Sequence, residues 1–299
     1  MKSDFAAIIL THARADRVRT YDTLRRRGYT GRIILLIDDE DNERDEYLAR
    51  YPGEVEQFSK AEWAERVDVG DNFSGRGVVV YARNAVWEVA RRIGLKWFVV
   101  LDDDYSYFSH RFAWDATYKQ MLSKRLDDVF AAFVDYLRAT PFVTVCMAQG
   151  GDYIAGGAGV LAIKGKRKAM NVFFCATERV FPFCGRLNED VTAYTSEQIR
   201  GAAMITHNGF SVCQCATQSN KGGLTEAYLE VGTYVKSFYS IMYAPSCVRI
   251  SVLAGHKNGV SHRRIHHRVN WNMAAPKIVP EIYRKEAGAG VKTMEAPDA

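Results

Sequence analysis

The sequence predicts an α/β domain with a mostly parallel central sheet flanked by helices. Apolar runs at Phe5–Leu10 and Arg32–Ile37 are typical of buried strands, and Arg17–Arg27 between them has helical spacing and ends at Gly28. A strand, a helix and a strand within about 35 residues form a βαβ unit, which makes the two strands a parallel pair.

A second helix and strand strengthen this prediction. Val78–Ile93 is amphipathic and ends at Gly94, and the apolar strand Lys96–Leu101 that follows runs directly into three aspartates. We predict these further elements: a helix at Asp45–Arg50, a strand at Val55–Phe58, a helix at Leu122–Leu137, strands at Phe142–Met147 and Val172–Thr177, a helix at Glu189–Arg200, and one or two strands in Met204–Cys215.

Composition indicates one soluble domain. Hydrophobic residues make up 47% and charged residues 25% of the 299 residues, and no repeat or linker-like tract divides the chain. We therefore expect a domain over residues 1–285 and a flexible tail at 286–299. No apolar stretch is long enough to span a membrane, the N-terminus does not resemble a signal peptide, and the six cysteines form no CxxC pair. These features predict a cytoplasmic protein without a membrane partner, and they leave its oligomeric state open.

The net charge of +5 is mildly basic, which fits a polyanionic partner as well as an ordinary small-molecule enzyme. Three clusters hold many of the basic residues, and a solvated face is the ordinary explanation of each. The first cluster lies near the start of the chain and consists of Arg14, Arg17, Arg19, Arg25, Arg26 and Arg27. The second lies at residues 164–168. The third lies near the end and consists of His262, Arg263, Arg264, His266, His267 and Arg268.

Polar residues follow three of the predicted parallel strands at the point where each strand ends. These are residues 11–14 (THAR), 38–40 (DDE) and 102–104 (DDD). Ligands of open α/β sheets bind beyond the carboxyl ends of the strands, so these three clusters are expected to meet in one site.

The aspartates at 102–104 suit a divalent cation. Mg²⁺ and Mn²⁺ take oxygen ligands, usually one or two carboxylates together with phosphate oxygens of a substrate. If the backbone stays extended, Asp102 and Asp104 point the same way and supply that pair. A turn or helix-capping cluster of acids is the alternative explanation.

The segment from Gly75 to Asp104, GRGVVVYARNAVWEVARRIGLKWFVVLDDD, resembles the core of GT-A glycosyltransferases. The matching features are the Gly-containing loop, Arg83-Asn84 near the start of a helix, and the strand that ends in Leu-Asp-x-Asp. The resemblance implies that Asp102 and Asp104 hold Mn²⁺ or Mg²⁺ on a nucleoside-diphosphate sugar, with UDP as the expected nucleotide. It also implies the nucleotide-sugar contacts Thr11, Arg14, Asp38, Asp39, Arg83 and Asp103.

The second half of the chain offers an acid pair and a histidine. Inverting members of this fold often carry acids at a helix start near the acceptor, and Glu189-Asp190 fits that pattern. Asp190 is our first candidate for the general base and Glu189 the second, although acids also stabilise helix N-termini electrostatically. By the same resemblance His256 is our first candidate for a third metal ligand, and inversion is expected although retention stays open.

The whole chain up to about residue 285 is similar to the TET-associated glycosyltransferases of bacteriophages. The features are LDDDY at 101–105, NED at 188–190 and SHRRIHHRVNWN at 261–272. That family is thought to add sugars to hydroxymethylated pyrimidines in DNA, which implies DNA contacts by the third basic cluster. Stacking on a flipped base is then possible for Tyr105, Tyr107, Phe108 and Trp271; core packing is the alternative for Trp271.

The resemblance further implies a nucleotide-sugar-binding half at 1–110 and an acceptor-binding half at 111–285. Three alternatives remain: a glycosyltransferase for a polysaccharide or lipid-linked acceptor, a nucleotidyltransferase, and a non-catalytic nucleic-acid-binding protein. A nucleotidyltransferase usually has a Gly-rich basic signature after the first strand, and residues 11–14 contain no glycine. The intact acids and Arg83 argue against a decayed enzyme.

Overall fold

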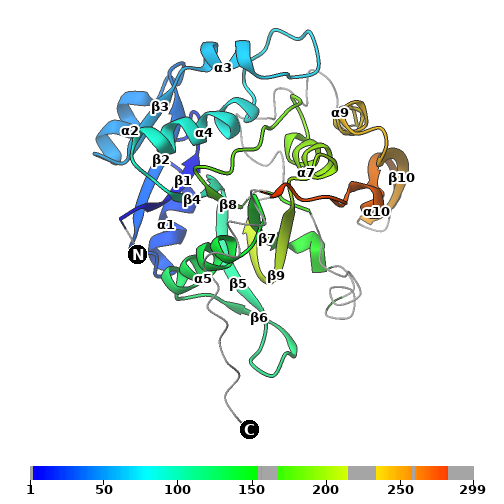
Figure 1. Cartoon of the computed structure of the whole chain (residues 1–299). Helices are drawn as coiled ribbons and strands as arrows, with labels where there is room; N and C mark the ends of the chain where they lie inside the picture. Colours follow the sequence, from blue (N-terminus) through cyan, green and yellow to red (C-terminus); the bar gives the residue numbers. More distant parts are fainter. Residues whose placement is uncertain are drawn as a thin grey trace.

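A nine-stranded sheet forms the centre of the computed structural model, which describes residues 3–153, 156, 168–170, 172–214, 234–257 and 260–281. The strand order is β3-β2-β1-β4-β8-β7-β9-β5-β6 (Figure 1). The strands are β1 Phe5–Leu10, β2 Arg32–Asp38, β3 Val55–Phe58, β4 Trp97–Asp102, β5 Tyr105–Phe112, β6 Tyr118–Leu122, β7 Thr144–Gln149, β8 Phe173–Ala176 and β9 Met204–Gln214.

The N-terminal half of the sheet is wholly parallel. Strand β1 pairs with β2 on one side and β4 on the other, and β2 pairs with β3, all in parallel. Beyond β4 the pairing is mixed, and only β8 and β5 run against the remaining strands. The predicted mostly parallel α/β sheet is thus confirmed, and the carboxyl ends of β1, β2 and β4 lie along one edge.

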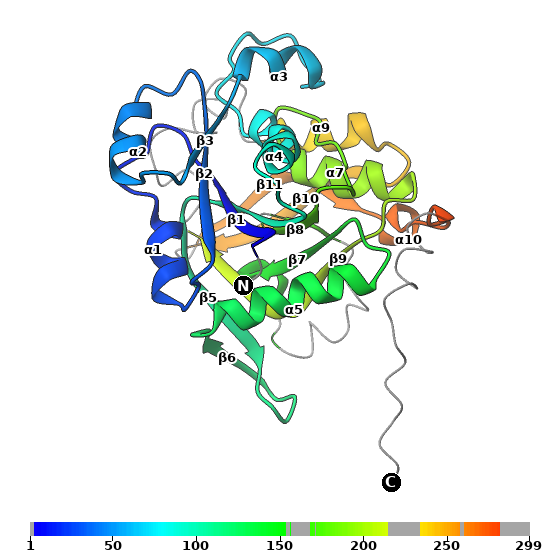
Figure 2. The same ribbon diagram turned by 60° about the vertical axis from the view of Figure 1, so that its left-hand side comes forward.

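Helices cover both faces because alternate strand residues point to opposite sides. Ala6 and Ile8 lie in one buried cluster with residues of α4 (Val80–Arg92) and α7 (Glu189–Ile199), whereas Ala7 and Ile9 belong to the cluster on the opposite face. That opposite face is covered by α1 (Arg19–Arg26) and α5 (Leu126–Ala139) (Figure 2). Two short helices, α2 (Arg44–Arg50) and α3 (Lys60–Arg66), flank β3 in sequence.

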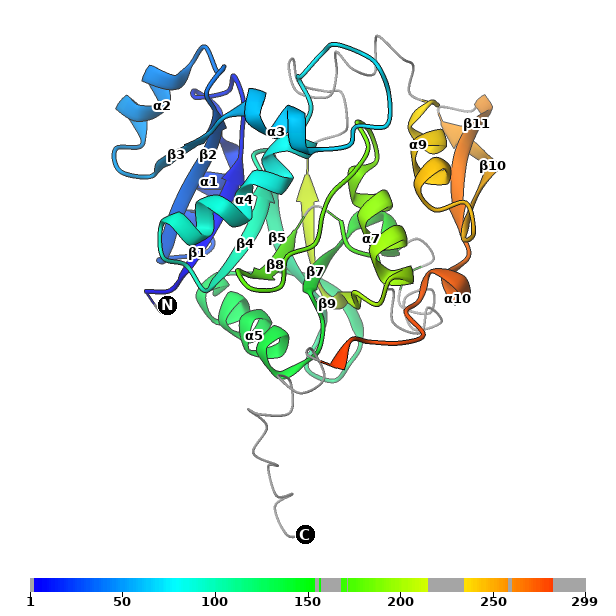
Figure 3. The ribbon, with the colours of Figure 1, turned by 45° about the horizontal axis from the view of Figure 1, so that its top comes forward.

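The C-terminal region builds a separate antiparallel hairpin. Strand β10 (Val248–Lys257) pairs with β11 (Val260–Val269), and α9 (Lys236–Tyr243) contacts both strands. Together they lie at the end of the molecule opposite α2 and β3 (Figure 3). The short elements η1 (Gly150–Tyr153) and α10 (Trp271–Ala274) complete the described structure.

Several elements were not predicted from the sequence. Strands β5 and β6 were missed, and the helix expected from Leu122 begins only at Leu126 because residues 118–122 form β6 instead. The hairpin β10–β11 and helices α3 and α9 were missed as well. The expected flexible tail at 286–299 lies outside the described residues.

Candidate functional site

The acidic turn, residues 102–104, lies where β4 ends, and its three carboxylates have different partners. Asp102 accepts a hydrogen bond from Nη2 of Arg83 at 2.6 Å. Asp103 accepts one from the Thr11 hydroxyl at 2.9 Å and one from Nη1 of Arg14 at 2.7 Å. Asp103 and Asp104 lie in a turn, so the backbone does not stay extended through the motif.

Asp104 is the residue of the acidic turn best suited to bind a cation. One of its carboxylate oxygens is buried and has no hydrogen-bond partner among the described residues. Burial and the neighbouring charges of Asp102 and Asp103 raise the pKa of Asp104 to about 7. A buried oxygen without a partner is costly, and a divalent cation would satisfy it and offset the repulsion among the carboxylates.

Arg83 connects the acidic turn to the acid pair of the second half. It is 3% exposed and comes from α4, whose buried face points at the end of β4. Its Nε lies 3.7 Å from Oε1 of Glu189 while its Nη2 holds Asp102. The buried guanidinium therefore compensates carboxylates from both halves of the chain, and its Nη1 has no hydrogen-bond partner within the described part of the chain.

Glu189 and Asp190 begin α7 and are both buried. Burial raises the pKa of each carboxyl above its ordinary value, and Arg83 acts in the opposite direction. Lys168 also acts to lower the pKa of Asp190. Burial lowers the pKa of Lys236, and the charge of Asp190 opposes that shift. The acid pair therefore interacts with Arg83 and with the charges of two lysines.

Asp38 and its neighbours form the end of the site at β2. Nδ1 of His12 lies 2.7 Å from Asp38, and the buried ammonium of Lys60 lies 2.9 Å from the same carboxylate. The hydrogen bond from His12 and the Lys60 charge outweigh the effect of burial and lower the pKa of Asp38. Asp39 instead accepts a hydrogen bond from the backbone N–H of Lys60 at 2.8 Å.

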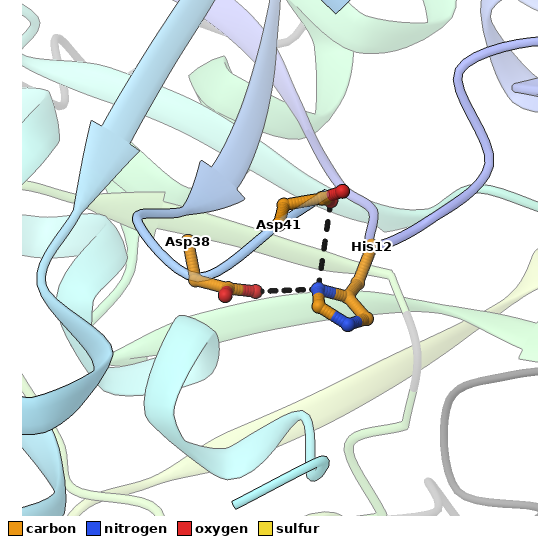
Figure 4. Close-up of side chains that lie close together, drawn as sticks. All are labelled: His12, Asp38 and Asp41. Carbon is orange, nitrogen blue, oxygen red and sulfur yellow. Dashed lines mark hydrogen bonds and ion pairs between the residues drawn. The ribbon is translucent and has the colours of Figure 1, made fainter. Parts of the chain in front are cut away.

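His12, Asp38 and Asp41 are close enough together to hold a cation (Figure 4). Their present partners favour another explanation, because Asp41 already accepts hydrogen bonds from the backbone N–H groups of Ala13 and Glu43. Together with the ion pair between Lys60 and Asp38, these contacts form a hydrogen-bonded polar cluster beyond the ends of β1 and β2. The acidic turn, with its unsatisfied oxygen, fits a cation better.

Arg186 fastens the Gly-containing loop at 68–78 to the segment that leads into α7. Its side chain is 2% exposed and donates bidentately to Asp71, with Nε–O 2.7 Å and Nη2–O 2.8 Å. It also donates to the carbonyls of Phe73 and Gly75. Asp71 further accepts a hydrogen bond from the Tyr239 hydroxyl of α9, so one carboxylate joins the loop to two later elements.

The hairpin β10–β11 brings one of the predicted acceptor residues to the acid pair. Nδ1 of His267 lies 3.2 Å from the amide nitrogen of Asn188, the residue before Glu189. Burial and nearby positive groups lower the pKa of His267 to about 4. The rings of His266 and His267 lie 4.3 Å apart, and Arg263, Arg264 and Arg268 are exposed.

Two predictions about the hairpin fall outside the described side chains. The backbone register places His256 opposite Ser261 and His262 opposite Gly255, but the side chains of His256 and His262 lie outside the described residues. The metal role of His256 therefore stays a prediction.

The stacking role suggested for two aromatic residues was wrong. Tyr105 is 0% and Phe108 is 1% exposed, because an irregularity of the strand between Tyr105 and Tyr107 lets both side chains pack in the same core cluster. Trp271 is 37% exposed and stacks on Tyr194 at 5.6 Å, so part of its ring still faces solvent.

His12 belongs to a predicted strand-end cluster, although no role was predicted for it, and three further site residues were not predicted: Asp41, Lys60 and Arg186. Asp41 lies three residues after the end of β2, so a signal for it was present in the sequence. Lys60 and Arg186 had none, because their partners are 22 and 115 residues away: Asp38 for Lys60 and Asp71 for Arg186. Within the described part of the chain, no helix has the length and apolar character needed to cross a membrane.

Comparison with solved structures finds remote likenesses. Glucosyl-3-phosphoglycerate synthase from Mycobacterium tuberculosis, in complex with Mn²⁺, UDP-glucose and glycerol 3-phosphate, is 14% identical with a TM-score of 0.46, covering 87% of this chain and 88% of that one. TarS 1–349 from S. aureus in complex with UDP is 10% identical with a TM-score of 0.41, covering 81% and 66%. No curated protein matches the chain.

The family comparison is decisive. The model of the TET-associated glycosyltransferases matches residues 5–223, a range that contains the strand-end clusters, Arg83, the acidic turn and the acid pair. This chain, with its parallel strands converging on an acidic turn, belongs to the TET-associated glycosyltransferase family.

Proposed function

We propose that this glycosyltransferase uses a divalent cation to transfer a sugar from a nucleoside-diphosphate sugar to the hydroxymethyl group of a modified pyrimidine in DNA. One observation carries the proposal. Arg83 bridges Asp102 of the acidic turn and Glu189 of the acid pair, which brings a cation site and a candidate base to a single centre.

Asp102 and Asp104 are the residues that would hold Mn²⁺ or Mg²⁺. The cation would neutralise and orient the diphosphate leaving group. The raised pKa of Asp104 and its unsatisfied oxygen support this assignment. Beyond β1 and β2, Asp38, Asp39, Thr11 and Arg14 are proposed to contact the nucleotide, with Asp103 fixing Thr11 and Arg14.

Asp190 is proposed as the general base and Glu189 as the second candidate. The base takes the proton of the acceptor hydroxyl as its oxygen bonds to the anomeric carbon, and the bond from that carbon to the diphosphate breaks. A pKa raised by burial strengthens a carboxylate as a proton acceptor. Arg83 lies against Glu189, which leaves Asp190 as the member nearer the lysines.

A negatively charged acceptor fits the surroundings of Asp190. The charges of Lys168 and Lys236 interact with that of Asp190, and the half-buried His267 lies beside Asn188. The positive charge of the two lysines would attract a phosphodiester strand, whereas a neutral polysaccharide does not need it. The exposed arginines of β11 extend this basic surface: Arg263, Arg264 and Arg268.

The test incubates the protein with Mn²⁺, a panel of nucleotide sugars beginning with UDP-sugars, and DNA with or without 5-hydroxymethylpyrimidines. We expect transfer to the modified DNA alone, detected by mass spectrometry of digested nucleosides. Asp104→Ala is expected to lose transfer by about 10³-fold or more and to lose the Mn²⁺-dependent part of UDP binding.

Two outcomes would refute parts of the proposal separately. Nucleotide-sugar hydrolysis without transfer to any modified DNA would exclude the DNA acceptor and favour a polysaccharide or lipid-linked one. Equal UDP affinity with and without Mn²⁺ would exclude the metal site at the acidic turn.

A further inference from the structure

A pocket of about 550 Å³ lies between α1, the segment that precedes it and the acidic turn. Five arginines and three aspartates line it: Arg14, Arg17, Arg19, Arg25, Arg26, Asp22, Asp103 and Asp104. Its volume is in the range of pockets that bind small ligands, and it is strongly charged. It borders the carboxylate proposed to hold the cation, but it is on the side facing α1 and away from the acid pair on α7.

The positive charges nearest β1 and β3 are already compensated. Nη1 of Arg14 donates to Asp103 at 2.7 Å. Nη2 of Arg25 lies 3.1 Å from Glu54, and its Nη1 donates to the carbonyls of Tyr29 and Gly31. These two arginines are therefore already paired with carboxylates and contribute little free charge to the pocket.

The charges on the outer surface are compensated poorly. Arg26 is exposed, donates to the Asp22 carbonyl and the Thr23 hydroxyl, and makes no ion pair with the carboxylates of the described residues. The nearest carboxylate oxygen to Arg17 is that of Asp16 at 3.8 Å, and both side chains are more than half exposed. An ion pair of this kind is worth little in water, so excess positive charge remains at the mouth of the pocket.

We propose that this arginine pocket binds backbone phosphates of the acceptor strand, an inference that rests on the DNA acceptor proposed above. The guanidinium group is planar and donates two parallel hydrogen bonds, which matches phosphate geometry. The uncompensated arginines are exposed, where a long polyanion reaches them.

The position of the pocket gives the strand a path across the reaction centre. Asp104 lines the pocket, and Arg83 joins the neighbouring Asp102 to Glu189 of the acid pair. His267 of the hairpin lies beside Asn188, the residue before that pair. A strand whose modified base enters at the acid pair would therefore run between the hairpin and α1 and bring a backbone phosphate to the pocket.

The double variant Arg17→Ala/Arg26→Ala tests the inference. The probe is a short fluorescent single-stranded oligonucleotide without hydroxymethylated bases, measured by fluorescence anisotropy over a range of salt concentrations. We expect its affinity to fall about five- to tenfold at about 0.1 M salt, and the slope of log K against log salt to shrink by about 1.4 for two lost phosphate contacts. UDP affinity in Mn²⁺ is expected to stay within about twofold.

The matched control is Arg91→Ala/Arg138→Ala, which removes two exposed arginines from the last turns of α4 and α5. We expect it to keep the oligonucleotide affinity within about twofold. An equal loss in the control, or no loss in the pocket variant, would overturn the inference. So would a fall in UDP affinity at constant oligonucleotide affinity, because that result would make the pocket part of the donor site.

The readouts separate this inference from the proposed function. Oligonucleotide binding needs neither a sugar donor nor the transfer reaction. If the arginine substitutions leave oligonucleotide affinity unchanged while sugar is still transferred to modified DNA, the assignment of the pocket is wrong and the proposed DNA acceptor is still supported. Conversely, arginine-dependent binding without any transfer supports the pocket and refutes the proposed acceptor. A wild-type protein that binds no oligonucleotide refutes both.

Discussion

The two halves of the site are built by different means. In the first half, parallel strands deliver Thr11, Asp38 and Asp102 to one edge of the sheet, so chain direction alone brings them together. In the second half, Glu189 is positioned by contacts with residues about 100 positions earlier, through Arg83 and the bonds of Arg186 to Asp71. The difference indicates that backbone topology sets the proposed nucleotide end, whereas a few buried ion pairs set the proposed acceptor end.

The largest expected effect separates the two halves by function. Asp190→Asn keeps the shape of the acid pair but removes the proposed proton acceptor, so we expect kcat for transfer to fall about 10³-fold. Mn²⁺-dependent UDP affinity, measured by calorimetry, should stay within about twofold because the acidic turn is unchanged. An unchanged kcat would show that Asp190 is not the general base and would make Glu189 the candidate. A loss of UDP affinity alongside the loss of kcat would show that the two halves of the site do not function separately.

The next largest effect is expected from removing Arg83, which bridges the two halves of the site. Arg83→Met leaves Asp102 and the buried Glu189 without their shared cation. Removing one partner of a buried ion pair typically costs about 3–5 kcal/mol, and we expect a loss of this size in the free energy of unfolding from urea titration. Arg66→Met on exposed α3 is the control, with an expected loss below about 1 kcal/mol. Equal losses would show that the bridge adds no more than a surface pair.

A smaller effect concerns the loop held by Arg186. The variant Arg186→Lys keeps the positive charge, but a lysine ammonium cannot donate to Asp71 and to two carbonyls at once. We expect KM for the nucleotide sugar to rise about tenfold with little change in kcat, because the loop is less ordered before the donor binds. Asp71→Asn should act alike, and the double variant should add little to either single change. Additive effects would contradict a shared clamp.

The smallest effect is a pH dependence at the nucleotide end. The hydrogen bond that His12 donates to Asp38 raises the pKa of His12 above 6.5, so the protonated imidazole is favoured in the folded state. Its contribution to stability is fully present below about pH 6.5 and is lost as pH rises through the higher folded-state pKa. We expect wild type to exceed His12→Asn in Tm by about 2 °C or less at pH 6, with the difference shrinking by pH 8. A difference that grows with pH would contradict the assignment.

The half of the site built from parallel strands was also the half that the sequence could predict. The strands that end at residues 10, 38 and 102 were predictable because buried parallel strands are continuous apolar runs, and Arg83 followed from a motif. Strand β5 was not predictable in this way, since YSYFSHRF mixes aromatic and polar residues. The clamp of Arg186 on Asp71 spans 115 residues, and no local pattern signals a pairing at that distance.

The acidic turn has a mechanical consequence that follows from the strand order. Asp103 and Asp104 alone join β4 to β5, yet β8, β7 and β9 lie between those strands in the sheet. In a flat sheet the two strands would be about 19 Å apart, while three residue steps span at most about 11 Å. The sheet must therefore curl there, so that β5 begins close to the end of β4 and a turn of two residues is enough to join them. Because a strand of the sheet anchors each end of this turn, the acidic turn has little freedom to move when substrates arrive.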